Sequence, residues 1–393
     1  MDPTAHRLTT PRSPGPDLLR ALAIVLVMLW HLPRPARLDS LEGLRQFGWT
    51  GVDLFFVLSG YLIGTQLLTP VARGELPRLP EFYLKRSLRI LPAFLTVLAL
   101  YAWVPALHEN LPPVWRYLTF TMNFGLDYRV GGPFTQAWSL CVEEHFYLLL
   151  PALVLMLRKA DWRGWALLLA SGVLVGGMAL RAALWLHVVA ATLPATSNEL
   201  SPIYLKTIYY PTYCRLDGLL FGVLLAAYRC FYPEHWRRYA DPRAALLLGV
   251  ATITLASFLF HYPSAPFIGG PTLSLLGATF GYPLLSFGCA CLLSASLDWE
   301  RYFAGWRVPG AAAIATISYS LYLTHKMASH LDPLLFDAEA LAGVSGLAIY
   351  FASSLAVAVL LWATVERPFL LLRDRLIRSR RSDLAPGARP SEA

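Results

Sequence analysis

The sequence predicts an all-α membrane protein, a polytopic transmembrane bundle of about ten helices. Hydrophobic residues make up 56% of the 393 residues and charged residues only 15%, whereas soluble domains carry about 25% charge. Mean hydropathy is +0.49. Apolar runs close to the ~20 residues that cross a bilayer recur along the chain, separated by short basic connectors. These features exclude a soluble enzyme, a disordered protein and a fibrous protein.

Ten apolar runs are the predicted spans: 17–32, 50–68, 88–107, 138–157, 162–189, 213–230, 243–260, 272–295, 310–330 and 341–365. The first run lacks a clear cleavage site, so we interpret it as a retained span rather than a signal peptide. Residues 1–16 are expected to be a disordered cytoplasmic N-terminus. Residues 17–372 would form the membrane-embedded domain, and residues 373–393 a basic cytoplasmic tail against anionic lipid.

Basic residues are distributed unevenly between the two sides of the predicted bundle. Of the 33 Lys and Arg residues, 24 fall on the side of the N-terminus, six on the other side and three within spans. The positive-inside rule therefore places both termini in the cytoplasm, which requires an even number of spans. We interpret the net charge of +8 as this membrane asymmetry and expect no nucleic-acid partner. The five scattered cysteines show no metal-ligand or disulfide spacing, so no metal is expected.

The first span carries two ionisable residues on one face. Arg20 and His31 are eleven residues apart, which corresponds to about three turns and an axial separation of ~16 Å. A guanidinium at the cytoplasmic mouth suits a phosphate, and an imidazole most of a span higher suits a general base. Taken alone, each could also be a structural interfacial residue.

Two more arginines begin the third span. Arg86 and Arg89 are i,i+3 neighbours and share a helix face. Together with Arg20 they would form a cytoplasmic basic cup, which fits a polyphosphate group better than a ligand of single charge.

Carboxylates within or near spans are the remaining candidates for acid–base chemistry. Asp53 lies at the outer end of the second span, at a depth similar to His31, and could orient the imidazole. Glu143 and Glu144 are adjacent in the fourth span, and at least one should face a polar cavity or an arginine. The structural alternatives are a helix cap for Asp53 and arginine partners for the glutamates.

Several polar or aromatic residues are candidates for substrate binding. Ser139 and Tyr147 share a helix face with Glu143, and Trp138 precedes them near an outer connector, where an aromatic ring could stack on a sugar. Arg215 and Asp217 are two residues apart, so they should pair with different helices. His325, in the ninth span, is the last candidate, and structural ion pairing is an equal alternative for it.

Seven motifs occur in order: Arg20-x10-His31, GVDLFFVLSGYLI, Arg86-x-x-Arg89-Ile-x-Pro, AWSLCVEEHFYLLLP, RLDGLLFG, SYSLYLTH and ERPF. Over about residues 17–369 the chain resembles the acyltransferase-3 family of integral-membrane acyltransferases, which includes bacterial O-acetyltransferases. The resemblance implies an acyl-CoA co-substrate, usually acetyl-CoA, with no permanently bound cofactor, and a hydroxyl acceptor, often on a sugar of a surface or lipid-linked glycan. It also implies that His31 is the essential histidine and that Arg86 and Arg89 belong to the donor or structural site.

Several alternatives remain open at this point. A transporter or flippase of glycan precursors would also have about ten spans, although the paired interrupted repeats typical of such proteins do not occur. The acceptor could instead be a small secondary metabolite. Transfer could be direct, or could pass through an acyl-enzyme on His31, Ser139, Cys141 or Ser59. The expected location is the bacterial cytoplasmic (inner) membrane.

Overall fold

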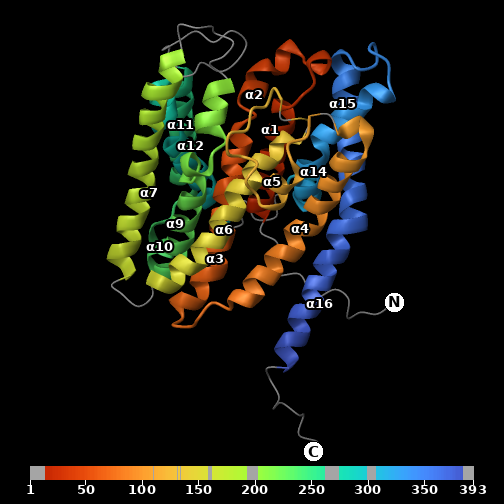
Figure 1. Ribbon diagram of the computed structural model, residues 1–393. Helices are drawn as coiled ribbons and strands as arrows, with labels where there is room; N and C mark the ends of the chain where they lie inside the picture. The colour runs from red at the N-terminus through yellow and green to blue at the C-terminus, as the bar shows by residue number, and fades with distance from the viewer. Residues whose placement is uncertain are drawn as a thin grey trace, which may run out of the picture.

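The structure, a computed structural model, describes residues 14–108, 110–130, 132, 134–157, 162–192, 202–261, 274–298 and 307–383. Within these ranges the regular structure is helical and no β-strand is formed, which confirms the predicted all-α class (Figure 1). A helical bundle is expected for so apolar a chain, because a helix satisfies every backbone polar group internally.

The N-terminal half contributes seven α-helices: α1 (Pro14–Trp30), α2 (Glu42–Gln46), α3 (Thr50–Ala72), α4 (Leu79–Trp103), α5 (Val114–Leu118), α6 (Trp138–Leu157) and α7 (Trp162–Leu184). A π-helical segment, η6 (Trp185–Val189), continues α7. Short 3₁₀ turns occur in the connectors: η2 (Arg34–Ala36), η3 (Asp39–Leu41), η4 (Pro105–Leu107), η5 (Thr135–Ala137) and η7 (Ala190–Thr192).

The C-terminal half contributes α9 (Asp217–Phe231), α10 (Pro233–Tyr239), α11 (Pro242–His261), α12 (Tyr282–Leu297), α14 (Ala311–Leu331), α15 (Gly343–Leu361) and α16 (Arg367–Asp383). Three more π-helical segments are η8 (Leu205–Tyr209), η10 (Gly277–Gly281) before α12, and η12 (Trp362–Glu366) between α15 and α16. The 3₁₀ turns are η9 (Thr212–Cys214) and η11 (Asp332–Leu334).

The helices form one bundle with α1, α3 and α6 near its centre (Figure 1). On one side, α9 packs against α3, and α11 against α12. On the other side, α14 packs against α1 and α15, and α4 contacts α14 and α16. The far end of α16 extends beyond the other helices at one end of the bundle (Figure 1).

Seven helices of the described residues are long and apolar enough to cross a membrane. They lie within 39–72, 79–103, 135–156, 164–189, 242–261, 277–297 and 343–379, and each overlaps a predicted span. The three other predicted spans correspond to α1 with 17 residues, α9 with 15 and α14 with 21. The first two are short and α14 carries His325 and Lys326 near its end, so the count of ten stays a prediction.

The ends of the membrane domain differ slightly from the predicted boundaries. Helix α1 begins at Pro14, so residues 14–16 are helical, and a side chain at Gly15 would lie 2.0 Å from the Ser296 carbonyl oxygen of α12. At the other end, α16 continues the last span to Asp383. The rest of the predicted N-terminus and tail lies outside the described residues, as do the basic connector residues 158–161 and Arg301.

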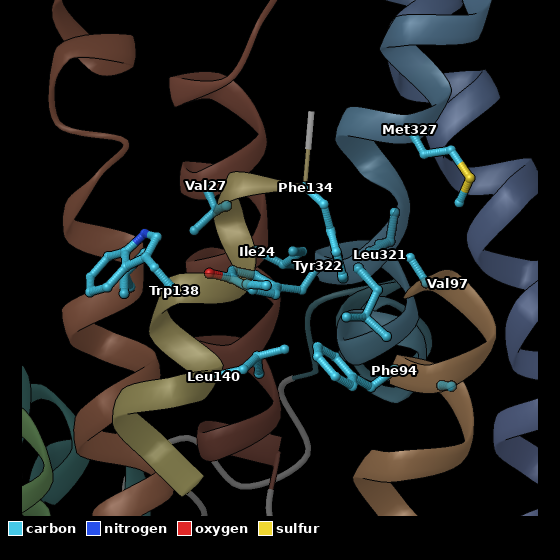
Figure 2. Packing of buried hydrophobic residues seen from close by; sticks show 14 of the residues in the cluster. Ile24, Val27, Phe94, Val97, Phe134, Trp138, Leu140, Leu321, Tyr322 and Met327 are labelled. Atoms are coloured by element: carbon cyan, nitrogen blue, oxygen red, sulfur yellow. The ribbon is translucent and has the colours of Figure 1, made fainter. Parts of the chain in front are cut away.

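The main apolar core joins α1, α4, α6 and α14. Figure 2 shows Ile24 of α1 beside Tyr322 of α14, and Leu140 of α6 directed toward Phe94 of α4. Ile24 and Val27 are 0% and 1% exposed. They lie on α1 between Arg20 and His31, so the two ends of the predicted polar stripe are separated by packed apolar side chains.

Candidate active site

A pocket of about 230 Å³ opens among α1, α3, α4, α6 and α14. Five of its lining residues are basic: Arg20, Lys85, Arg86, Arg89 and Arg373. The sequence predicts the cup of Arg20, Arg86 and Arg89, and the structure brings all three to this one pocket. Because Glu143 is the single acidic residue among the described lining residues, the pocket favours an anionic ligand.

Local helical geometry explains how the arginines reach the pocket. Arg86 and Arg89 project from the same face of α4, as their i,i+3 spacing requires. The Arg86 guanidinium lies 4.9 Å from the centre of the Tyr147 ring on α6, a distance suited to a cation–π contact. Arg20 donates to Asp17 one turn earlier on α1, at 2.9 Å. Among the described residues Arg86 and Arg89 form no ion pair with a carboxylate, so their charges are available to an anion.

Glu143 forms the acidic side of the pocket. Its carboxylate accepts hydrogen bonds from the Ser59 hydroxyl at 3.0 Å and from the Tyr147 hydroxyl at 2.6 Å. Ser139, Glu143 and Tyr147 all line the pocket, which agrees with the shared helix face predicted for them. Glu144 is not among the lining residues, because it lies about 100° around α6. Of the two glutamates, Glu143 is therefore the one that faces the cavity.

Tyr322 of α14 and Ser139 of α6 both line the pocket and contact each other. Their hydroxyl oxygens are 2.5 Å apart, and the Tyr322 hydroxyl also donates to the Gln136 carbonyl at 2.9 Å. The centre of the Tyr322 ring is 6.1 Å from that of His325, one turn further along α14. Tyr322 thus lines the arginine pocket and also lies beside the next polar cluster.

That cluster is a pair of histidines. His31 follows the last residue of α1, and His325 lies in the last two turns of α14. Nε2 of His325 is 3.3 Å from Nδ1 of His31, and the ring centres are 5.0 Å apart. His31 is half-buried and is not among the residues that line the arginine pocket. In this structure the pocket stops short of it.

Two buried ion pairs stabilise the helices on the other side of α3. Both carboxylate oxygens of Asp53 accept hydrogen bonds from Arg215 at 3.0 Å. Asp217 accepts from Arg181 of α7 at 2.7 Å and 3.2 Å. Arg215 and Asp217 thus pair with different helices, as their spacing predicts.

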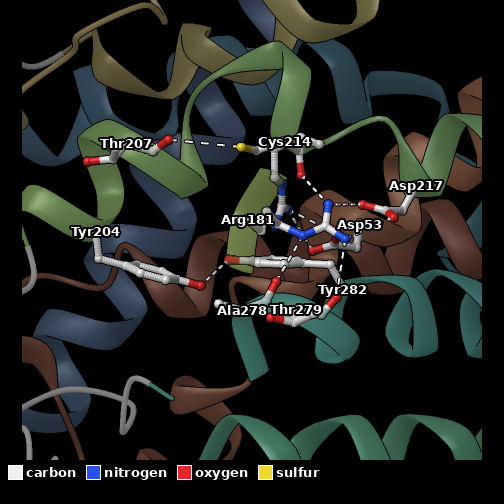
Figure 3. A network of polar contacts seen from close by, with 10 residues as sticks. Asp53, Arg181, Tyr204, Thr207, Cys214, Asp217, Ala278, Thr279 and Tyr282 are labelled. Carbon is white, nitrogen blue, oxygen red and sulfur yellow. Dashed lines mark hydrogen bonds and ion pairs between the residues drawn. The ribbon is translucent and has the colours of Figure 1, made fainter. Parts of the chain in front are cut away.

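The Arg181 pair is part of a wider polar network between α7, η9 and η10. Its guanidinium also donates to the carbonyls of Cys214 and Ala278, at 2.7 Å and 2.9 Å (Figure 3). A buried arginine needs several acceptors, because each of its N–H donors must be hydrogen-bonded and its charge must be balanced.

The expected contact between Asp53 and His31 is not formed, which corrects that part of the sequence interpretation. The Asp53 carboxylate points to Arg215, whose guanidinium is enclosed by the rings of Tyr209 and Tyr282, 4.6 Å and 4.1 Å away. Glu143 is held by Ser59 and Tyr147 instead. Within the described residues no carboxylate contacts the His31 ring.

The proposed substrate-binding residues are divided between three places. Ser139 and Tyr147 line the pocket, and His325 contacts His31. Trp138 packs against Tyr209, with ring centres 4.8 Å apart, close to Arg215. Trp138, Arg215 and Asp217 are therefore structural neighbours of the pocket and do not line it.

Sequence reasoning missed three features of the site. Lys85 and Arg373 join the arginines, and His325 meets His31. Lys85 is adjacent to Arg86 in the sequence, so its position beside the predicted cup could have been inferred. Arg373 reaches the pocket because α16 packs on α4. His31 and His325 each lie toward the C-terminal end of a predicted span. Because these two spans are predicted to cross the membrane in the same direction, the two histidines lie at a similar depth.

The fold and the site define a class of protein: an integral-membrane helical protein with a basic pocket next to a pair of histidines. A model of the acyltransferase-3 family, described as an acyltransferase domain, matches residues 13–363. The chain therefore belongs to this family of membrane acyltransferase enzymes, and the resemblance inferred from its motifs is confirmed.

Curated relatives carry O-acetyltransferase names. The chain is 31% identical over 228 residues to the peptidoglycan O-acetyltransferase OatA of Listeria monocytogenes, covering 54% of this chain and 33% of the relative. It is 25% identical over 338 residues to the O-acetyltransferase OatA of Staphylococcus aureus, covering 81% and 51%. The chain thus spans about a third to a half of the length of these relatives. No solved structure matches it.

Proposed function

We propose that the protein is a membrane O-acyltransferase that moves an acyl group, most simply acetyl, from cytoplasmic acyl-CoA to a hydroxyl of a sugar in a surface or lipid-linked glycan. The observation that carries this proposal is the arginine pocket, where five basic side chains meet inside a helical membrane bundle. The names of the O-acetyltransferase relatives support the acetyl group and the glycan acceptor.

Arg20, Arg86 and Arg89 are the proposed partners of the CoA phosphates. Guanidinium groups bind phosphate through paired hydrogen bonds, and these three line one cavity. The pantetheine arm would extend along the pocket toward Ser139 and Tyr322. The excess of Lys and Arg on the N-terminal side supports a cytoplasmic location for this mouth and for both termini, in a bacterial inner membrane.

His31 is the proposed general base. Its imidazole takes the proton from the acceptor hydroxyl as the oxygen attacks the thioester carbonyl. The tetrahedral intermediate then collapses, the C–S bond breaks, and the leaving thiolate takes the proton back from the imidazolium. Ser139 and Tyr322 line the pocket whereas His31 does not, so the donor arm would have to extend past the lining residues of the pocket for transfer to occur.

Thioester cleavage in membranes tests the proposal. Membranes containing the protein are given acetyl-CoA, a glycan acceptor and a thiol reagent, and free CoA is measured. Wild type should release CoA in an acceptor-dependent manner, and His31→Ala should not. His108→Ala is the matched control, because His108 is exposed in a connector. Equal rates for wild type and His31→Ala would remove the proposed role of His31.

Labelled donor without acceptor distinguishes direct transfer from an acyl-enzyme. Stable label on the protein would identify a covalent intermediate. Of the candidate nucleophiles His31, Ser139, Cys141 and Ser59, the two serines line the pocket. No label supports direct attack assisted by His31. Comparing the mass of surface glycans with and without the gene would identify the transferred group.

A further inference from the structure

We infer that His325 is a positioning residue for His31, accepting a hydrogen bond that holds the ring with Nδ1 protonated and Nε2 free to act as the base. The catalytic consequence rests on the function proposed above. The hydrogen-bonding arrangement does not, and it can be tested separately. It assigns to a second histidine the task that a carboxylate was expected to perform.

The first step concerns the proton on His31. Nδ1 of His31 lies 2.9 Å from the carbonyl oxygen of Val27, one turn earlier on the chain. A carbonyl oxygen can only accept a hydrogen bond, so the nitrogen that faces it must carry a hydrogen. In the neutral ring the other nitrogen, Nε2, then holds the lone pair.

The second step fixes the proton on His325 in the same way. Its Nδ1 lies 3.0 Å from the Leu321 carbonyl oxygen and therefore carries a hydrogen. Nε2 of the neutral His325 ring is then an acceptor, and it lies 3.3 Å from Nδ1 of His31. The Nδ1–H group of His31 is thus shared between the Val27 carbonyl and His325.

The two acceptors have different effects on the His31 ring. Val27 belongs to the same chain segment and its carbonyl also accepts the His31 backbone N–H, at 3.2 Å. His325 comes from another helix and is 0% exposed, so its ring is held by packing. It therefore fixes the direction of the His31 ring relative to α14. When Nε2 of His31 takes a proton, the positive ring donates more strongly to both acceptors.

Other groups around the pair do not replace this contact. Lys326 directs its ammonium to the Thr135 hydroxyl at 2.6 Å. Asp53 is paired with Arg215. Among the described residues, His325 is therefore the side chain that orients His31, and its role resembles that of the orienting member of a catalytic triad.

Nitrogen NMR on the full-length protein in lipid bilayers tests the arrangement without any substrate. With ¹⁵N-labelled histidine, the wild type should show protonated Nδ1 and bare Nε2 on His31, and a ¹⁵N–¹⁵N correlation from His31 Nδ1 to His325 Nε2. Spectra of His31→Ala and His325→Gln assign the two rings. A bare Nδ1 on His31, or a protonated Nε2 on His325, would overturn the inference whether or not the protein proves to be an acyltransferase.

Kinetics of two variants test the consequence. His325→Gln retains an acceptor oxygen near the position of Nε2 and should keep kcat within a few-fold of wild type. His325→Phe fills the space without an acceptor and should lower kcat about 10- to 100-fold, the loss expected for one hydrogen bond to a charged group. The KM for acetyl-CoA should not change in either, because the arginine pocket is untouched.

The positioning role would be refuted if His325→Phe has the kcat of the wild type, provided that a wild-type unfolding midpoint shows the variant to be folded. Equal losses in the Gln and Phe variants would also refute it. A wild type without transferase activity, but with the expected nitrogen spectrum, would instead refute the proposed function and leave the histidine pair established.

Discussion

Replacing Gly60 with alanine tests how closely α3 and α9 must approach. A Cβ atom at Gly60 would lie 2.1 Å from the carbonyl oxygen of Leu219 and 2.8 Å from its carbonyl carbon. These are backbone atoms of α9 and cannot rotate away. Since ordinary contacts begin near 3.4 Å, the helices would have to separate by roughly 1 Å, and overpacking of this kind costs about 1–3 kcal/mol.

The Gly60 contact is the middle of a continuous seam. A Cβ at Gly222 of α9 would lie 2.3 Å from the Val57 carbonyl oxygen, and one at Gly218 would lie 2.8 Å from Phe56 Cβ. Separation at Gly60 therefore loosens contacts along both helices, and we expect Gly60→Ala to lose at least about 2 kcal/mol of unfolding free energy. Gly172→Ala in α7 is the matched control, because nothing lies within 4 Å of its added methyl group. It should change stability by less than about 1 kcal/mol, in the stabilising direction.

The cysteines provide the assay. Cys141, Cys214, Cys289 and Cys291 are buried free thiols, so a thiol-reactive fluorophore reports their exposure as the protein is heated in detergent. The unfolding midpoint should fall for Gly60→Ala and hold or rise for Gly172→Ala. We attribute the need for glycine at position 60 to the close backbone contact between α3 and α9, and not to helix propensity. Equal unfolding midpoints for Gly60→Ala and Gly172→Ala would refute this explanation.

Three further predictions concern charge. Asp217→Asn leaves the buried Arg181 guanidinium without its carboxylate and should cost about 3 kcal/mol of stability in the same heating assay; an unchanged midpoint would contradict this. Arg86→Ala should raise the KM for acetyl-CoA at least about 10-fold through loss of a charge-assisted phosphate contact, and steady-state kinetics with an unaltered KM would exclude Arg86 from the donor site. In the connector after α5, hydrogen bonds from Arg129 lower the pKa of Asp127. Their stabilisation is present above the ordinary aspartate pKa of about 3.9 and is lost as the pH falls through the lowered value. Arg129→Ala should therefore raise the Asp127 pKa in a carbon NMR titration, and an unmoved titration would count against the pair.

Helix period and composition were enough to predict the all-α bundle and the arginine cup. Apolar runs of membrane-crossing length have few alternatives to helix, and i,i+3 spacing fixes the shared face of Arg86 and Arg89 without any tertiary information. The shared face of Ser139, Glu143 and Tyr147 follows from the same geometry.

Partners across helices were harder to predict. Periodicity gives the direction of the Asp53 side chain on α3, but not which neighbouring helix faces it. The sequence interpretation paired Asp53 with His31 because the two residues lie at a similar depth, whereas in the structure the Asp53 carboxylate forms an ion pair with Arg215. The same limit hid the His31–His325 contact and the arrival of Arg373 at the pocket. The sequence predicts how deep a residue lies along its helix. The order of the helices around the bundle depends on how all the helices pack together, and the sequence pattern does not predict it.

The pairing of Arg181 with Asp217 couples the biogenesis of two segments. During synthesis α7 emerges from the ribosome before its counter-charge, which is 36 residues further along the chain. A lone arginine in a nascent span opposes partition from the translocon into lipid, by about 2.5–3.5 kcal/mol at the centre of a helix. We therefore expect stable insertion of α7 to require α9, because a nascent chain truncated between them would leave Arg181 without the carboxylate that neutralises it.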